Sequence, residues 1–195
     1  DDTLGVLYPV PGIRLATVSA GIKKPGRRDL VLMELAGGAT TAAVFTRNAF
    51  CAAPVTVARE HLLASAGRPR YLLVNTGNAN AGTGPAGIEA ARACTRMVAS
   101  AGEVSAEVVL PFSTGVIGEP LPTRLIEAAM PAAFVALSAE GWADAALGIM
   151  TTDTRPKGCS LRFQAGGAEF VITGIAKGAG MIRPNMATML AYIAT

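Results

Sequence analysis

The chain has 195 residues, enough for one sizeable core, and 51% of them are hydrophobic while 16% are charged. The formal net charge of +3 is small and dispersed, which argues against nucleic-acid binding through a clustered basic face. No segment has the ~20 uncharged apolar residues of a membrane helix, and the sequence does not begin with the layout of a secretory signal. A reduced, cytoplasmic compartment is expected because three cysteines lie far apart without metal or redox spacing: Cys51, Cys94 and Cys159.

The first 60 residues alternate β-rich runs with turn signals, a spacing typical of an antiparallel meander. A basic turn, which we expect to be solvated, separates the first two runs and contains Lys23, Lys24, Arg27 and Arg28. The expected strands cover 13–22, 29–38, 40–48 and 53–60. A short helix at 61–67 and an apolar strand at 71–77 follow.

The middle of the chain is predicted to be mainly helical. Residues 87–101 have the period of an amphipathic helix, with an apolar face formed by Ile88, Ala91, Cys94, Met97 and Val98. A strand that ends in a Thr-Gly turn and a proline-rich connection is expected at 108–122. Further helices are expected at 123–139, where Pro131 is predicted to start a new helix, and at 142–150.

Two final strands, 160–167 and 168–180, meet at Gly166-Gly167, which is a strong signal for a two-residue hairpin. Strands therefore come first, helices fill the middle and a hairpin leads into the tail. This order favours an α+β fold over a doubly wound sheet, in a single domain over 1–195.

Four polar segments interrupt the apolar sequence: NTGNANAGTG (75–84), STGVIG (113–118), TTDT (151–154) and KGAGM (177–181). The glycines of the first are out of register with a nucleotide-binding fingerprint, which favours a structural turn rich in Asn and Gly. In the second, the Thr114 hydroxyl and the Gly115 amide could aim two donors at one oxygen, as an oxyanion hole requires. The same two residues also form a common turn.

The usual catalytic sets are missing from the sequence. His61 is the single histidine and is interpreted as a capping or surface residue, so a Ser-His-Asp or Cys-His arrangement has little support. Near the polar segments we find only two carboxylates, Glu119 and Asp153. That argues against paired-carboxylate chemistry and against a metal site.

The tail, KGAGMIRPNMATMLAYIAT (177–195), places Thr188 behind a glycine-rich basic loop and within an apolar run. A threonine hydroxyl needs a base before it can act as a nucleophile, and the nearest base would be the α-amine of Thr188 itself. Cutting the Ala187–Thr188 bond would free that amine. The alternative is an apolar strand or helix in which Thr188 only packs.

Taken together, NTGNANAGTG, PFSTGVIGEPLP, GIMTTDT and IAKGAGMIRPNMATMLAYIAT resemble, in order and spacing, the ornithine acetyltransferase family of arginine biosynthesis, also called bifunctional glutamate N-acetyltransferase. The resemblance runs from about Gly5 to Thr195. It implies a precursor that cuts itself between Ala187 and Thr188 into an α chain and a β chain. It also implies a layered α/β/β/α sandwich of the self-cleaving acyltransferase/aminopeptidase kind, completed by the C-terminal β chain, and an assembly of two α and two β chains.

The resemblance also implies a role for each matched residue. Thr188 would be the nucleophile, the Thr114 hydroxyl and the Gly115 amide the oxyanion hole, and Thr151, Lys177 and Thr188 the substrate contacts. A lysine ammonium on a glycine loop suits the α-carboxylate of an amino-acid substrate. The implied reaction moves acetyl from N-acetylornithine to glutamate through an acetyl-threonine, by a ping-pong mechanism without a metal. Acetyl-CoA serves as a further donor in bifunctional members.

The sequence departs from the family pattern at Gly82, where many relatives have Cys or Ala, and at Arg183, where a small residue is common. Neither position is among the matched site residues. Two other interpretations remain open. One is an N-terminal-nucleophile aminopeptidase or amidohydrolase on a similar scaffold, and the other is a non-catalytic assembly module whose glycine segments are turns.

Overall fold

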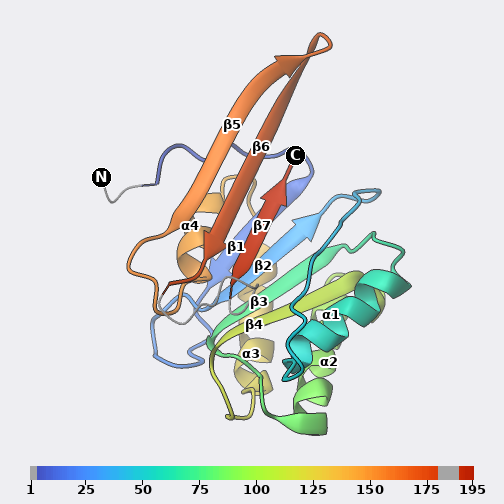
Figure 1. The fold of residues 1–195 in the computed structure, drawn as a ribbon, viewed down its shortest axis with the longest axis vertical. Helices are drawn as coiled ribbons and strands as arrows, with labels where there is room; N and C mark the ends of the chain where they lie inside the picture. Colours follow the sequence, from blue (N-terminus) through green and yellow to red (C-terminus); the bar gives the residue numbers. More distant parts are fainter. Residues whose placement is uncertain (1–3, 180–188) are drawn as a thin grey trace.

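Two sheets and four α-helices form the described part of the chain, which a computed structural model gives as residues 4–179 and 189–195 (Figure 1). In chain order the elements are β1 (Ile13–Val18), β2 (Leu30–Leu35), α1 (Ala53–Ala64), β3 (Tyr71–Asn78), α2 (Gly84–Ala101), the short 3-10 helix η1 (Ala106–Val108), β4 (Val109–Val116), α3 (Thr123–Val135), α4 (Trp142–Gly148), β5 (Lys157–Ala165), β6 (Ala168–Lys177) and β7 (Leu190–Ala194).

The first sheet has the order β1-β2-β3-β4, and the second has the order β5-β6-β7. All pairs are antiparallel except β3 and β4, which run parallel because α2 carries the chain back across the sheet. Thr76 therefore lies opposite Thr114, and Gly77 opposite Gly115. The parallel pairing brings the first two polar glycine segments to the same end of the sheet.

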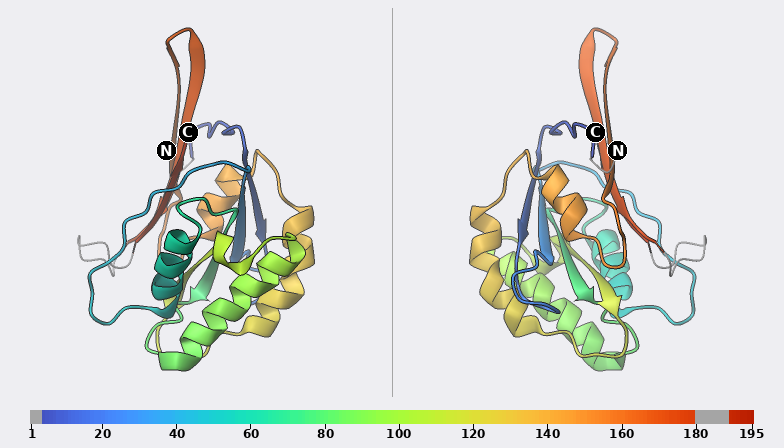
Figure 2. Two further views of the ribbon diagram at one scale, coloured as in Figure 1. Left: turned by 90° about the vertical axis from the view of Figure 1, so that its right-hand side faces the viewer. Right: turned by 90° about the vertical axis from the view of Figure 1, so that its left-hand side faces the viewer.

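The first sheet is buried on both faces, as the alternating side chains of β2 show. Leu30 and Leu32 pack with α2 and α3, in a cluster that also contains Leu73, Cys94, Val98 and Ile126. Val31 and Met33 point to the other face, where α4 and the second sheet supply Trp142, Ile175 and Tyr192. The chain thus forms the predicted α+β sandwich, with helices on one side of the first sheet and a second sheet on the other (Figure 2).

The expected meander is wrong after β2. Residues 40–48 form no strand, and 53–60 begin helix α1, which also takes in most of the short helix expected at 61–67. Pro54 stands in the first turn of α1, where its missing N–H costs nothing. Burial of Ala53, Val57 and Ala58 at helical spacing outweighs the β-propensity of the valines and threonine in this segment.

His61 is not a surface or capping residue, as the sequence had suggested, but is part of the core. It lies inside α1, is 9% exposed, and its Nδ1 is 2.8 Å from the carbonyl oxygen of Val109. Because a carbonyl oxygen only accepts, Nδ1 must carry the hydrogen. The bond ties α1 to the start of β4.

Pro131 does not start a new helix, because α3 runs without a break from Thr123 to Val135. Its buried residues Ile126, Met130 and Ala133 lie on both sides of the proline and face the same core. Packing of this face therefore offsets the lost hydrogen bond that proline imposes on a helix interior.

The expected hairpin turn and amphipathic helix are confirmed. The hairpin turn has positive φ at both Gly166 (58°) and Gly167 (81°), as a type I′ turn requires. The amphipathic helix begins at Gly84, slightly earlier than predicted, and buries Ala91, Cys94 and Val98 of its expected face. All three cysteines are free thiols. Among residues 4–179 and 189–195, no helix is both long and apolar enough to cross a membrane.

Candidate active site

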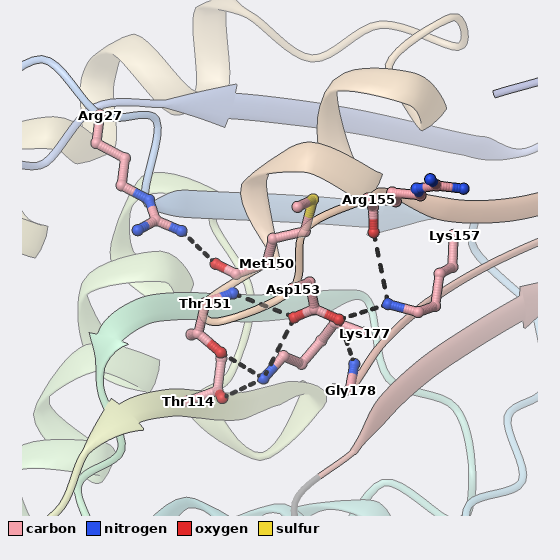
Figure 3. A network of polar contacts seen from close by, with 9 residues as sticks. All are labelled: Arg27, Thr114, Met150, Thr151, Asp153, Arg155, Lys157, Lys177 and Gly178. Carbon is pink, nitrogen blue, oxygen red and sulfur yellow. Dashed lines mark hydrogen bonds and ion pairs between the residues drawn. The ribbon is translucent and has the colours of Figure 1, made fainter. Parts of the chain in front are cut away.

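Three of the predicted site residues meet at one ammonium group. Lys177, the last residue of β6, donates a hydrogen bond from Nζ to Oγ1 of Thr151 (2.7 Å) and to Oγ1 of Thr114 (3.0 Å). Thr114 is near the end of β4, and Thr151 follows α4 (Figure 3). The second sheet, the first sheet and the TTDT segment therefore converge here.

The end of β4 is shaped by a glycine pair. Gly115 has φ of 142° and Gly77, its partner on β3, has φ of 95°, and the register shifts at Asn78, which lies opposite both Thr114 and Val116. A Cβ at Gly115 would lie 2.3 Å from the carbonyl carbon of Gly77, so a side chain cannot fit there. Such a bulge bends the strand and re-aims neighbouring groups. Here Gly115 is exposed directly beside the buried Thr114.

The first polar segment, 75–84, is a scaffold for this strand end. The side-chain amide of Asn78 donates to the carbonyl oxygens of Glu119 and Pro120, both at 3.1 Å, and its oxygen accepts from the backbone N–H of Asn80. The Asn80 amide donates in turn to the Gly87 carbonyl oxygen. These contacts confirm the expected structural turn, which fastens the chain after β4 to the chain after β3.

Asp153 is a site residue that sequence reasoning missed. Its fully buried carboxylate accepts hydrogen bonds from Lys157 Nζ (2.6 Å), the Gly178 N–H (2.7 Å) and the Thr151 N–H (3.4 Å). Oδ2 of Asp153 also lies 4.0 Å from Nζ of Lys177. The sequence carried a signal for it, since Asp153 is an acidic residue in a polar segment of a charge-poor chain.

The pKa values of both buried groups, Asp153 and Lys177, are shifted, and Asp153 is one of the groups that act on Lys177. Burial by itself would raise the pKa of Asp153, but the hydrogen bonds from Lys157, Gly178 and Thr151 outweigh it and hold that pKa below the usual value. Burial lowers the pKa of Lys177, the Asp153 carboxylate raises it, and the positive charge of Lys157 lowers it again, with a net decrease. The site thus contains a buried ion pair that depends on its hydrogen bonds.

The basic turn between β1 and β2 packs beside the site. Asp29, which is buried, accepts hydrogen bonds from the N–H groups of Ala20 (2.7 Å) and Ile22 (2.6 Å), and this holds the turn against the sheet. Arg27 donates to the Met150 carbonyl oxygen, next to Thr151 (Figure 3). The turn is solvated as predicted except for this half-buried arginine, which braces the TTDT segment.

The proposed nucleophile and cleavage bond, Ala187–Thr188, lie outside the described residues. The chain directly after them is described: Leu190 opens β7 and pairs with Lys177 on β6. Within 4–179 and 189–195, no group of three or more His, Cys, Asp or Glu residues could hold a metal ion.

Comparison with known proteins places these features in a family. The ArgJ family model matches residues 14–195. The chain is 59% identical over 192 residues to the arginine biosynthesis bifunctional protein ArgJ of Pseudomonas syringae pv. tomato and 60% identical over 189 residues to that of Methylococcus capsulatus. These matches cover 98% and 97% of this chain but 47% and 46% of the relatives, so the chain spans about half the length of the curated relatives it matches.

Two solved structures share the fold. A crystal structure of ArgJ from Bacillus halodurans has a TM-score of 0.82 and 35% identity, over 91% of this chain and 92% of the solved chain. The ornithine acetyltransferase of Mycobacterium tuberculosis, crystallised with ornithine, has a TM-score of 0.83 and 38% identity, over 97% of this chain and 96% of the solved chain.

Proposed function

Because this chain belongs to the ArgJ family, we propose that the full-length protein containing it transfers acetyl from N-acetylornithine to glutamate in arginine biosynthesis. The observation that carries the proposal is the contact of Lys177 with both Thr114 and Thr151. These three residues come from distant parts of the sequence, and all were assigned to the site by the family resemblance. A cluster of turns without function would give no reason for a buried ammonium to join them.

The first step in this proposal is self-cleavage. Thr188 Oγ attacks the Ala187 carbonyl carbon, the acyl group moves from nitrogen to oxygen, and water hydrolyses the ester. The products are an α chain that ends at Ala187 and a β chain that begins at Thr188 with a free amine. Two comparisons support this step, since the curated relatives are about twice as long as this chain while the matching solved chains have nearly its length.

Turnover would use the same hydroxyl. The Thr188 amine takes the proton of Oγ, which attacks the acetyl carbonyl of N-acetylornithine, and ornithine leaves as the amine. The amine of glutamate then attacks the acetyl-threonine ester and releases N-acetylglutamate. In both steps the Thr114 hydroxyl and the Gly115 amide would donate to the oxygen that becomes negative.

Lys177 and Thr151 would form part of the substrate pocket. Two hydrogens of the Lys177 ammonium go to threonine oxygens, while its nearest carboxylate oxygen, on Asp153, is 4.0 Å away. Among the described residues, no further hydrogen bond from this ammonium is present, so its third hydrogen can bind a substrate carboxylate.

The remaining parts of the proposal concern the whole protein. The β chain from the same precursor would complete the sandwich and the pocket, two α and two β chains would assemble, and acetyl-CoA would serve as a second acetyl donor. We place the enzyme in the cytoplasm and assign it no other cofactor.

One pair of measurements tests the proposal. Intact mass and N-terminal sequencing of the full-length protein after expression are expected to give a chain that begins at Thr188. Incubation with N-acetylornithine and isotopically labelled glutamate is expected to give labelled N-acetylglutamate. Release of acetate regardless of glutamate would indicate an amidohydrolase instead, and an uncut, inactive protein would indicate an assembly module.

A further inference from the structure

Asp153 contacts the TTDT segment and the chain at the end of β6, although it is not one of the residues that the family resemblance assigned. Its carboxylate binds the N–H of Thr151 and the N–H of Gly178, which are the backbone groups at or next to the two substrate-contact residues Thr151 and Lys177. It also lies beside the Lys177 ammonium (Figure 3). One buried side chain therefore contacts the backbone next to this lysine and places a negative charge beside its ammonium.

The direction of each hydrogen bond at Lys177 follows from its charge. An ammonium group has three donors and no acceptor, so the oxygens of Thr114 and Thr151 must both accept from it. The hydrogen of the Thr114 hydroxyl is then left to point elsewhere, and Thr114 makes no other side-chain hydrogen bond to a described residue. That hydrogen is available to the oxyanion.

A neutral Lys177 would reverse this arrangement. An uncharged amine has a lone pair, which accepts well from a hydroxyl, so the Thr114 hydrogen would turn toward Nζ and away from the substrate. Burial favours this neutral form because it removes the ammonium from water. A nearby counter-charge opposes it, and Asp153 is the carboxylate that the structure provides within 4.0 Å.

We propose that Asp153 is a positioning residue: its buried carboxylate keeps Lys177 as an ammonium donor, and Lys177 thereby directs the Thr114 hydroxyl hydrogen at the oxyanion. Asp153 itself touches no reacting atom. The inference rests on the proposed acetyl transfer and adds to it the group that sets the donor direction of the oxyanion hole.

Several charged groups surround Lys177 and decide the sign of the pH effect. Asp153 lies on the segment before β5 and Lys157 at the start of β5, and they act on Lys177 in opposite directions. Arg27 reaches in from the basic turn to the Met150 carbonyl, and the guanidinium of Arg155 points away from Lys177 in Figure 3. A Lys177 that must be protonated gives an alkaline limb, with activity lost as pH rises through the pKa of Lys177.

The test compares two variants of the full-length protein by the pH dependence of kcat for acetyl transfer. Asp153→Asn removes the counter-charge, so the alkaline limb is expected to move to lower pH by ~1 unit or more. Lys157→Gln removes a neighbouring positive charge, so the alkaline limb is expected to move to higher pH. If this cluster had only a structural role, both variants would lower kcat, but their alkaline limbs would not move in opposite directions along the pH axis.

A double-variant cycle provides a second readout. If Asp153 acts through the Thr114 hydroxyl, Asp153→Asn is expected to lower kcat much less in a Thr114→Ala background than in the wild type. Equal losses in both backgrounds would overturn the inference, as would alkaline limbs that stay in place in both single variants.

The titration of Lys177 can also be followed without the reaction. Trace labelling with acetic anhydride across a pH series, read by mass spectrometry of the peptide that contains Lys177, is expected to show a lower pKa in Asp153→Asn and a higher pKa in Lys157→Gln. A wild-type protein without transferase activity would refute the proposed function, and the labelling would then still decide the role of Asp153.

Discussion

Lys177 has a central place in the site because its charged group can only donate. Two threonines separated along the chain from Lys177 by 63 and 26 residues accept from it, and the Asp153 carboxylate lies next to it. The buried ammonium therefore orients hydroxyl groups as well as carrying charge. A serine or threonine held in this way acts as a directed donor, which a freely rotating hydroxyl does not.

The Thr114 hydroxyl can be tested by removal. Thr114→Ala is expected to reduce acetyl transfer by ~10²–10³-fold, the usual cost of one oxyanion donor, with little effect on folding. Thr114→Ser keeps the hydroxyl and is the matched control, expected to retain most of the activity. Steady-state rates with N-acetylornithine and glutamate provide the measurement, and near-normal rates for the alanine variant would remove Thr114 from the mechanism.

The strands and helices that carry the site each have a local reason for their shape. The bulge where β4 ends depends on two facing glycines with positive φ, and α3 tolerates a proline because both halves of the helix bury the same face. The ends of β3 and β4 are therefore shaped by backbone geometry, whereas α3 is held in place by packing.

The glycine requirement of β4 predicts a difference between two similar substitutions. Gly115→Ala places a Cβ 2.3 Å from the Gly77 backbone, whereas Gly118→Ala, also at positive φ, meets nothing within 4 Å. Gly118→Ala is expected to cost ~1–2 kcal/mol from its backbone conformation alone. Gly115→Ala is expected to cost clearly more and to reduce transfer, as measured by urea unfolding and by rate. Equal losses of stability in the two variants would show that the end of β4 can shift to accommodate a side chain at position 115.

The proline in α3 predicts a stabilising change. Pro131 is exposed, and alanine there would restore a helix hydrogen bond that proline cannot make. Pro131→Ala is expected to raise the free energy of unfolding by ~1–3 kcal/mol. The exposed Glu127→Ala on the same helix serves as the control and is expected to change it by less than ~0.5 kcal/mol. A destabilised Pro131→Ala would contradict this account of α3.

The molecule as a whole has a compact layered body from which the outer part of the β5–β6 hairpin projects (Figures 1 and 2). Leu161 on this projection is 58% exposed, and Phe163 and Phe170 stack there with ring centroids 5.6 Å apart while remaining partly exposed. Exposed apolar side chains of this kind are typical of a surface that another chain covers. Given that the relatives are about twice as long, we expect that chain to be the β chain.

This expectation can be tested by adding a charge to the projection. Leu161→Asp in the full-length protein is expected to weaken the association of the two chains, because it buries a carboxylate at the interface. Val135→Asp is a matched control, since Val135 is 89% exposed at the end of α3, away from the hairpin. Sedimentation or size-exclusion analysis provides the readout. If both variants assembled as the wild type does, the interface with the β chain would have to lie elsewhere.

Local sequence patterns are sufficient to predict those elements whose formation depends on neighbouring residues in the chain. The Gly166-Gly167 turn, the amphipathic helix α2 and the apolar strands β1 to β3 were predicted correctly, because turn chemistry and residue period act over a few positions. The residues of the site were named by a family resemblance. Among them, the structure brings Thr114, Thr151 and Lys177 together, and the roles of all the site residues, Thr188 and Gly115 included, stay predictions.

Long-range packing decided the rest. From its sequence, the segment that begins α1 is predicted to be a strand, and only its burial in the fold explains why it is a helix. From its sequence, His61 is predicted to lie at the surface, and only the structure shows its hydrogen bond to Val109. In the sequence, Asp153 is an isolated acidic residue, and only the fold brings it next to Lys157 and Lys177. Burial and charge pairing depend on residues that are distant in the chain, and a local pattern contains no information about which distant residues will meet.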